Sequence, residues 1–137
     1  MSKCIYLAGA IDHVSPEFAT LWRRYAARKL EKVGYHILDP TAGKDLKAPS
    51  DYTPEHIVET DKAMIDRSDI ILAEMSKVNI PYVGTSMEIH YAWERGKEIV
   101  VWGGPRGYWI RYHAAKIFMN LGEALQYLES EVKTWKS

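Results

Sequence analysis

The sequence predicts an α/β fold in which helices cover both faces of a doubly wound, five-stranded parallel sheet, giving a three-layer sandwich. Apolar segments of strand length alternate along the chain with longer segments whose apolar residues recur at helical spacing. The most convincing strand, residues 69–75 (DIILAEM), is apolar almost throughout, which is typical of a central strand covered on both faces. Strands and helices that alternate in this way build parallel sheets.

The bulk composition favours one domain spanning residues 1–137. Hydrophobic residues make up 47% of the chain and charged residues 26%, which is ordinary for a globular protein. The 18 basic side chains balance the 18 acidic ones, so we expect no nucleic-acid partner, because such a binder needs excess positive charge. Cys4, the single cysteine, excludes an internal disulfide and favours a reducing compartment. The sequence has no signal-peptide pattern and no membrane-length apolar run, so we expect a cytoplasmic protein with no membrane partner.

The first part of the chain predicts two strands joined by a long helix. Residues 3–8 form a short apolar strand that ends at Gly9. The helix over residues 16–32 has Ser15 as N-cap and a proline at its first position. A second strand, residues 35–38, is stopped by an Asp-Pro pair. The helix is expected to bury Phe18, Leu21, Trp22, Tyr25 and Leu30 and to expose Arg23, Arg24, Arg28 and Lys29.

The rest of the chain begins with a polar connection, residues 41–52, whose length is typical of a lid or a binding loop. Loops at the carboxyl ends of parallel strands gather on one edge of the sheet, where ligands bind. The further elements are expected to be a helix over 54–67, the strand over 69–75, a helix ending at 96, a strand over 98–102, an irregular segment, a short strand over 116–119 and a helix over 121–132.

Several segments are expected to meet at this ligand-binding edge. Glycines at positions 9 and 84 would let a ligand approach the backbone closely. The sequence lacks the dinucleotide-binding fingerprint, the P-loop and any metal-ligand spacing of His, Cys and carboxylates, so no cofactor and no metal are expected. The residues that follow the first two strands at this edge are Gly9, Ala10, Ile11, Asp12 and Asp39.

The stretch VGTSMEIHYAWERG, residues 83–96, is where we expect the chemistry. Thr85 and Ser86 can cap a helix, and Glu88 would fall in its first turn. A carboxylate at the mouth of a strand-to-helix loop is well placed to act on a ligand. The same residues also fit a capping box, in which Glu88 would bond to the N-cap amide and have no catalytic role.

Three blocks of the sequence resemble the nucleoside 2-deoxyribosyltransferase superfamily, which includes related deoxynucleotide and nucleotide N-glycosidases. The blocks are IYLAGAI near the start, TDKAMIDRSDIILAEM in the middle and VGTSMEIHYAWERGK later, in the order that the family has them. The third block is the most specific. The resemblance implies a flavodoxin-like fold, a nucleoside or nucleotide as small-molecule substrate, and a role in nucleotide metabolism such as salvage.

Carried over residue by residue, the resemblance implies three catalytic side chains. Glu88 matches the nucleophile that attacks the anomeric carbon of the sugar, Tyr6 the tyrosine that orients it, and Asp61 the aspartate that assists at the base or sugar. Without the resemblance, Asp61 would be a solvated helix residue and Tyr6 a core aromatic. The substrate-binding positions expected beside them are Gly9, Ala10, Ile11, Asp39, Gly84, Ser86 and Met87.

The chain also departs from the family pattern. Tyr82 stands near the position where the transferases carry an aspartate that handles the base, and Asp12 where the nucleotide hydrolases place an arginine. Family members complete the pocket with a segment of a neighbouring subunit, so the resemblance implies a homo-oligomer. The segment expected to do this is 109–113, in which Arg111 would reach an anionic group or, alternatively, lie on the surface beside packing aromatics.

These features predict an enzyme that cleaves the N-glycosidic bond of a 2′-deoxynucleoside or its 5′-monophosphate. A covalent glycosyl intermediate on Glu88 would pass the sugar to another base or to water. Three alternatives stay open: a nucleotide N-glycoside hydrolase without transferase activity, an enzyme that cleaves a ribosyl bond in a dinucleotide, and a nucleotide-binding module without catalysis.

Overall fold

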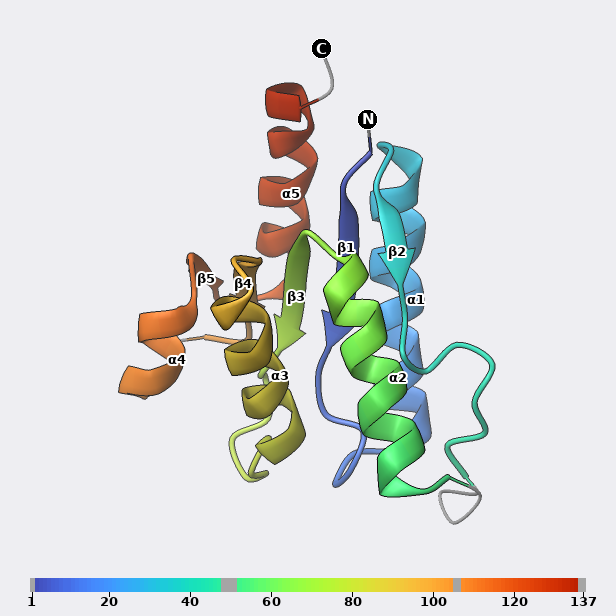
Figure 1. Cartoon of the computed structure of the whole chain (residues 1–137). Coiled ribbons are helices and arrows are strands. Elements are labelled where there is room, and N and C mark those ends of the chain that lie inside the picture. The colour runs from blue at the N-terminus through green and yellow to red at the C-terminus, as the bar shows by residue number, and fades with distance from the viewer. Residues whose placement is uncertain (1, 48–51, 105–106, 136–137) are drawn as a thin grey trace.

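A computed structural model describes residues 2–47, 52–104 and 107–135 of the chain. Five strands form one parallel sheet in the order β2-β1-β3-β4-β5 (Figure 1). This is the strand order of flavodoxin-like doubly wound sheets, and it confirms the predicted fold class. The strands are β1 (Cys4–Ala8), β2 (His36–Leu38), β3 (Ile70–Glu74), β4 (Glu98–Trp102) and β5 (Lys116–Phe118).

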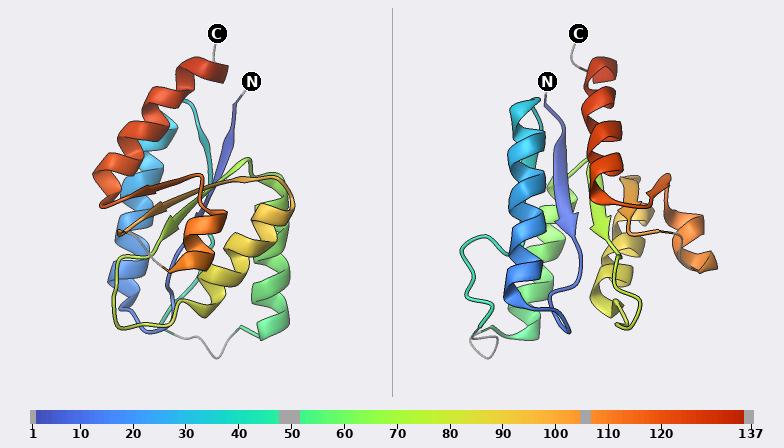
Figure 2. Two further views of the ribbon diagram at one scale, coloured as in Figure 1. Left: turned by 90° about the vertical axis from the view of Figure 1, so that its left-hand side faces the viewer. Right: turned by 180° about the vertical axis from the view of Figure 1, so that it is seen from behind.

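Helices cover both faces of the sheet and make the outer layers of the sandwich. On one face α1 and α5 pack side by side, and on the other α2 and α3 do so, with α4 against α3 (Figure 2). Among the described residues, no helix is long and apolar enough to cross a membrane. The helices are α1 (Pro16–Lys32), α2 (Pro54–Arg67), α3 (Val83–Glu94), α4 (Tyr108–His113) and α5 (Leu121–Trp135).

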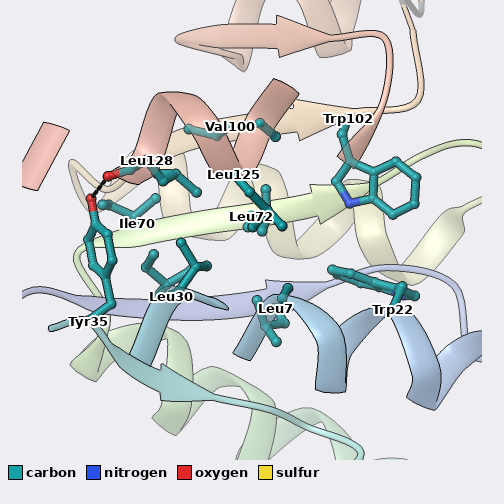
Figure 3. Packing of buried hydrophobic residues seen from close by; sticks show 13 residues of the cluster. Leu7, Trp22, Leu30, Tyr35, Ile70, Leu72, Val100, Trp102, Leu125 and Leu128 are labelled. Carbon is teal, nitrogen blue, oxygen red and sulfur yellow. Dashed lines mark hydrogen bonds between the residues drawn. The ribbon is translucent and has the colours of Figure 1, made fainter. Parts of the chain in front are cut away.

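The core beneath α1 and α5 is built from leucine, isoleucine and aromatic side chains (Figure 3). The rings of Trp22 and Trp102 meet edge to face with centroids 5.5 Å apart. The hydroxyl of Tyr35 donates a 2.6 Å hydrogen bond to the Leu128 carbonyl, which ties the start of β2 to α5. This face of the molecule is therefore filled by the protein's own side chains.

Residues of β1 alternate between the two cores, as a strand requires. Ile5 and Leu7 belong to the core beneath α1 and α5, whereas Tyr6 and Ala8 belong to the core beneath α2 and α3. Ile89 of α3 packs in that second core. Tyr6 is the only predicted catalytic residue in a strand, and its side chain points toward α2 and α3, the helices that carry Asp61 and Glu88.

The expectation for α1 was wrong at three positions. Arg23 is fully buried, not solvated, while Leu21 and Tyr25 are 60% and 43% exposed. The buried stripe of α1 follows a single helical ridge, Ala19, Trp22, Arg23, Ala26 and Leu30, and residues 21 and 25 lie outside it.

The irregular segment expected between β4 and β5 contains a short helix, α4. Its residues are mostly large and exposed, so no apolar stripe marks it in the sequence. The expectation of an irregular connection was therefore wrong for residues 108–113.

Candidate active site

The site is organised around a hydrogen bond between β1 and α3. Tyr6 lies fully buried in the middle of β1, and its hydroxyl donates to Oε2 of Glu88 at 2.6 Å. The two residues are 82 positions apart in sequence, so only the fold brings them together. Oε2 of Glu88 is therefore held in place by a buried donor.

The capping-box alternative for Glu88 does not describe the start of α3. The helix begins at Val83, with Tyr82 as N-cap in the left-handed backbone conformation and no side-chain cap bond. Thr85 and Ser86 lie inside the helix, and Glu88 lies in its second turn. The Glu88 carboxyl group is consequently turned toward Tyr6 and not back to its own helix end.

Asp61 of α2 completes an acidic pair with Glu88. Its carboxyl group lies within hydrogen-bonding reach of the Glu88 carboxyl group. Lys44, on the connection after β2, places Nζ 3.9 Å from Oδ1 of Asp61, and that oxygen has no hydrogen-bond partner among the described residues. Two carboxyl groups from facing helices thus meet beside one phenol.

Burial sets the proton balance of this pair. Removal from water raises the pKa of Glu88 to about 8, the Tyr6 hydrogen bond opposes this rise, and the neighbouring Asp61 adds to it. Burial also raises the pKa of Asp61, while its hydrogen bond to Glu88 and the charges of Lys44 and Arg23 act in the opposite direction. Near neutral pH such a pair shares a proton, so one group is an acid and the other a carboxylate.

Tyr6 stays protonated across the working range of pH. Burial, and then the charge of Glu88, raise the pKa of its hydroxyl far above the ordinary value for tyrosine. It is therefore a permanent hydrogen-bond donor to Glu88. A donor aimed at a carboxylate favours the ionised form of that carboxylate.

Beside the acidic pair lies a cavity of about 770 Å³, lined by α2, α3 and α4. Both Asp61 and Glu88 are among its lining residues. A volume of this size is typical of sites for small molecules, which combine an apolar lining with a few polar groups. Its apolar lining includes Ile57, Val58, Ile65, Met87, Trp109 and Ile110.

The structure brings part of the predicted site into this cavity. Gly84, Ser86 and Met87 line it together with the acidic pair. Apart from the chain neighbours of Gly84 and the backbone of its own helix, no atom of the described residues lies within 4 Å of the position that a Cβ on Gly84 would occupy. The segment 109–113 contributes three lining residues, Trp109, Ile110 and His113. Here they belong to the same chain as the acidic pair.

The other predicted binding residues lie outside the lining of the cavity. The Gly9 carbonyl accepts a hydrogen bond from Arg23, and the Ala10 amide donates to Glu74. Asp39 accepts from the amide and hydroxyl of Thr41, at 2.8 and 2.7 Å. Ile11 is half-buried in the loop after β1. Arg111 is exposed, with its guanidinium 5.9 Å from the centroid of the Tyr108 ring.

Two buried ionisable side chains near the site, Arg23 and Glu74, were missed by the sequence analysis. Arg23 was expected on the surface, and Glu74 was read only as part of a strand. A charged residue inside the apolar run IILAEM is a signal that could have identified Glu74. Among the described residues, no group of three or more His, Cys, Asp or Glu side chains is arranged to hold a metal ion.

The fold and this cluster define an α/β protein with a carboxylate, a carboxylic acid and a phenol beside a ligand-sized cavity. The family model described as Nucleoside 2-deoxyribosyltransferase matches residues 5–121. The chain belongs to this family, which confirms the resemblance found in the sequence. Membership supports an enzyme of the glycosyltransferase or N-glycosidase kind.

Solved structures with the same fold are distant in sequence. A 2-desoxiribosyltransferase from Leishmania mexicana is 19% identical, with a TM-score of 0.71, over 93% of this chain and 97% of that one. A 2-deoxyribosyltransferase from Bacillus psychrosaccharolyticus is 17% identical, with a TM-score of 0.70, over 90% and 91%. The CMP N-glycosidase BcmB from Clostridium botulinum is 20% identical, with a TM-score of 0.63, over 97% and 100%. No curated protein sequence matches the chain.

Proposed function

We propose that the chain cleaves the N-glycosidic bond of a 2′-deoxynucleoside or its 5′-monophosphate through a covalent glycosyl–Glu88 intermediate. The observation that carries the proposal is the contact of Tyr6, Glu88 and Asp61 beside a cavity of about 770 Å³. Cleavage of this bond builds positive charge on the sugar, which a carboxylate stabilises and then traps.

In the free protein the shared proton lies on Glu88, because the hydrogen bond between the two carboxyl groups raises the pKa of Glu88 and lowers that of Asp61. In the first step this proton passes to Asp61, so that Glu88 acts as the carboxylate and Asp61 as the acid. The other oxygen of Glu88, Oε1, attacks C1′ while Tyr6 holds Oε2. The bond from C1′ to the base nitrogen breaks, its electron pair goes to that nitrogen, and the Asp61 carboxyl group donates a proton to the base. The products of this step are the free base and an ester between C1′ and Glu88.

In the second step the roles of the two carboxyl groups reverse. A second base or a water molecule attacks C1′ and gives its proton to Asp61, and the ester bond to Glu88 breaks. Two displacements at the same carbon retain the configuration of the sugar. A base as acceptor makes the protein a transferase, and water makes it a hydrolase.

We infer transfer-capable chemistry from the Met87-Glu88 block, which resembles the transferases. The hydrolase alternative rests on Tyr82, which stands near the position of the base-handling aspartate of those enzymes. Its hydroxyl donates to buried Glu74 and accepts from the amide of Lys77, so Tyr82 points into the protein. A base in the cavity would then lack that carboxylate.

We further propose that a second copy of the chain packs over the outer side of α3 and α4. Tyr108, Trp109 and Tyr112 are 85%, 79% and 70% exposed, and Trp93 of α3 lies beside them. Trp109 belongs both to this aromatic surface and to the cavity lining, so an added subunit would close the site. A dimer or larger assembly in light scattering, reduced to a monomer by Trp109→Ala with Tyr112→Ala, supports this; a wild-type monomer at working concentrations contradicts it.

The experiment that tests the activity is incubation with a panel of 2′-deoxynucleosides and 5′-monophosphates, with and without a free acceptor base. A new nucleoside that forms only with the acceptor indicates a transferase, and free base and sugar without the acceptor indicate a hydrolase. Glu88→Gln keeps the shape of the side chain and should remove turnover while the protein stays folded. Binding of panel members without any cleavage by the wild type would favour the non-catalytic module.

A further inference from the structure

Arg23 of α1 is completely buried, and its guanidinium group donates hydrogen bonds to three backbone carbonyls. Nε donates to Leu7 at 3.2 Å, Nη2 to Gly9 at 3.0 Å and Nη1 to Ala19 at 2.7 Å. A buried cation is costly unless it is fully bonded and near opposite charge. Two of the three carbonyls follow Tyr6 closely in the chain: Leu7 lies in β1, and Gly9 is the first residue after it.

The buried carboxyl group of Glu74 binds the same segment after β1 through the next backbone amide. Its Oε1 accepts from the Ala10 amide at 3.1 Å, and its Oε2 accepts from the amide and hydroxyl of Ser76, each at 2.8 Å. The Gly9–Ala10 peptide therefore has its carbonyl on Arg23 and its amide on Glu74. A Cβ on Gly9 would lie 2.9 Å from the Cβ of Glu74, so a larger residue fits there only if the neighbouring atoms shift.

Arg23 is the only fully buried cation among the described residues, and acidic groups surround it. Asp39, at the end of β2, places Oδ1 3.9 Å from Nε. Tyr6, Glu88 and Glu74 also act on Arg23 electrostatically, and its positive charge in turn acts on Asp61. The other cation close to the acidic pair, Lys44, is partly exposed and therefore screened by water.

We propose that Arg23 is a positioning residue of the active site, which fixes the end of β1 behind Tyr6 and supplies a permanent positive charge to the Asp61–Glu88 pair. Its consequence for turnover rests on the proposed function. Its effect on the acidic pair does not, because that effect exists in the protein without substrate. Removal of the charge raises the pKa values of both carboxyl groups, since Arg23 now lowers them.

The test is titration of the Glu88 and Asp61 carboxyl carbons by NMR in the substrate-free protein, with Glu88→Gln and Asp61→Asn used for assignment. Arg23→Met should move the combined midpoint upward by about one pH unit. Arg24→Met removes the neighbouring exposed arginine of the same helix and should leave the midpoint unchanged. A folded Arg23→Met protein that titrates like Arg24→Met overturns the proposal.

Two further variants keep the test decisive if Arg23→Met does not fold. Asp39→Asn removes the negative partner of Arg23 and leaves the three carbonyl bonds in place, so the midpoint should move downward; an upward shift contradicts the proposal. Arg23→Lys keeps the charge and loses the three-way bonding, so the midpoint should stay near that of the wild type.

For an active enzyme, Arg23→Lys should lower kcat at least tenfold with little change in KM, because the fixed end of β1 is lost while the cavity lining is intact. Full kcat in Arg23→Lys refutes the positioning role. If no nucleoside is cleaved by the wild type, the proposed activity fails, and the NMR midpoints still decide whether Arg23 controls the acidic pair.

Discussion

Replacement of Tyr6 by phenylalanine isolates the single hydrogen bond that joins β1 to Glu88. The hydroxyl lies 2.6 Å from Oε2 of Glu88, and the residue Tyr6 is fully buried, so phenylalanine removes this hydrogen bond and keeps the ring. A hydrogen bond to a charged group contributes about 1.5–3 kcal/mol, which corresponds to about 1–2 pH units. The pKa of Glu88, already raised to about 8, should rise by that amount in Tyr6→Phe.

The expected consequence is a shifted pH–rate profile. Because the proposed mechanism has Glu88 react as the carboxylate, kcat/KM should fall on the acid side of its pKa, and the acid limb of Tyr6→Phe should move upward by about 1–2 pH units. At pH 7 this is a loss of about 10–100-fold, and much of it should be recovered as the pH is raised.

The assay is the initial rate of base release between about pH 5 and pH 10, with Tyr127→Phe as a control. Tyr127 also donates to a carboxylate, Glu98 at 2.7 Å, but it lies on α5 at the opposite face of the sheet. Its variant should keep the wild-type profile. A folded Tyr6→Phe enzyme whose acid limb coincides with that of the wild type would refute the assignment of Tyr6.

Three further substitutions have outcomes that follow from the same geometry. Glu88→Gln should become more stable relative to the wild type as the pH rises from about 4.5 to about 8. A carboxyl group whose pKa is raised in the folded state stabilises the fold at low pH, and this contribution is lost as the pH rises through the folded pKa. Urea unfolding at pH 5 and pH 9 measures the difference in unfolding free energy between the two proteins, and an equal difference at both pH values contradicts the prediction. Asp61→Asn should lower kcat by about 10²–10⁴-fold and move the acid limb downward, since it removes both the acid and the charge that raises the pKa of Glu88; a rate near that of the wild type would exclude Asp61 as proton donor. Gly9→Ala should destabilise the fold by about 1–3 kcal/mol, because its Cβ would lie 2.9 Å from Glu74 and 3.0 Å from Trp22; a melting temperature equal to that of the wild type would show that the loop yields freely.

The sheet could be predicted from the sequence because each strand is a short apolar run between helix signals. Ser15 and Pro16 mark the start of α1, and Gly34, with φ of 109°, follows its end. The residues that start and end a helix act within one or two turns, so these boundaries can be recognised without knowledge of the tertiary structure. The order of elements then leaves few topologies for a parallel sheet.

The buried charges could not be predicted in the same way. An arginine is expected on the surface from its residue type. Arg23 nevertheless lies on the inner ridge of α1, and its burial is stabilised by hydrogen bonds to the carbonyls of Leu7 and Gly9. The start of α3 was misplaced for a related reason. Thr85, Ser86 and Glu88 fit a helix cap, but the left-handed backbone of Tyr82 begins the helix earlier.

The pairing of Tyr6 with Glu88 depends on tertiary structure, and no spacing rule joins residues 82 positions apart. The resemblance to the family supplied both residues and Asp61, and the structure brings the three together. Gly9, Ala10 and Asp39 were expected at the ligand-binding edge because they follow the first two strands. Their position at the carboxyl edge follows from topology, while their bonds to Arg23, Glu74 and Thr41 follow from side chains elsewhere in the chain.

The proposed covalent bond between Glu88 and C1′ is tested most directly by intact-protein mass spectrometry with a 2′-fluoro-substituted deoxynucleoside. The fluorine destabilises positive charge on the sugar and slows release of the glycosyl group once it has been transferred. The wild type should gain the mass of one fluorinated sugar, with the label on the peptide that contains Glu88, and Glu88→Gln should gain none. Base release by the wild type without any labelled protein, or a label on Glu88→Gln, would contradict the central claim.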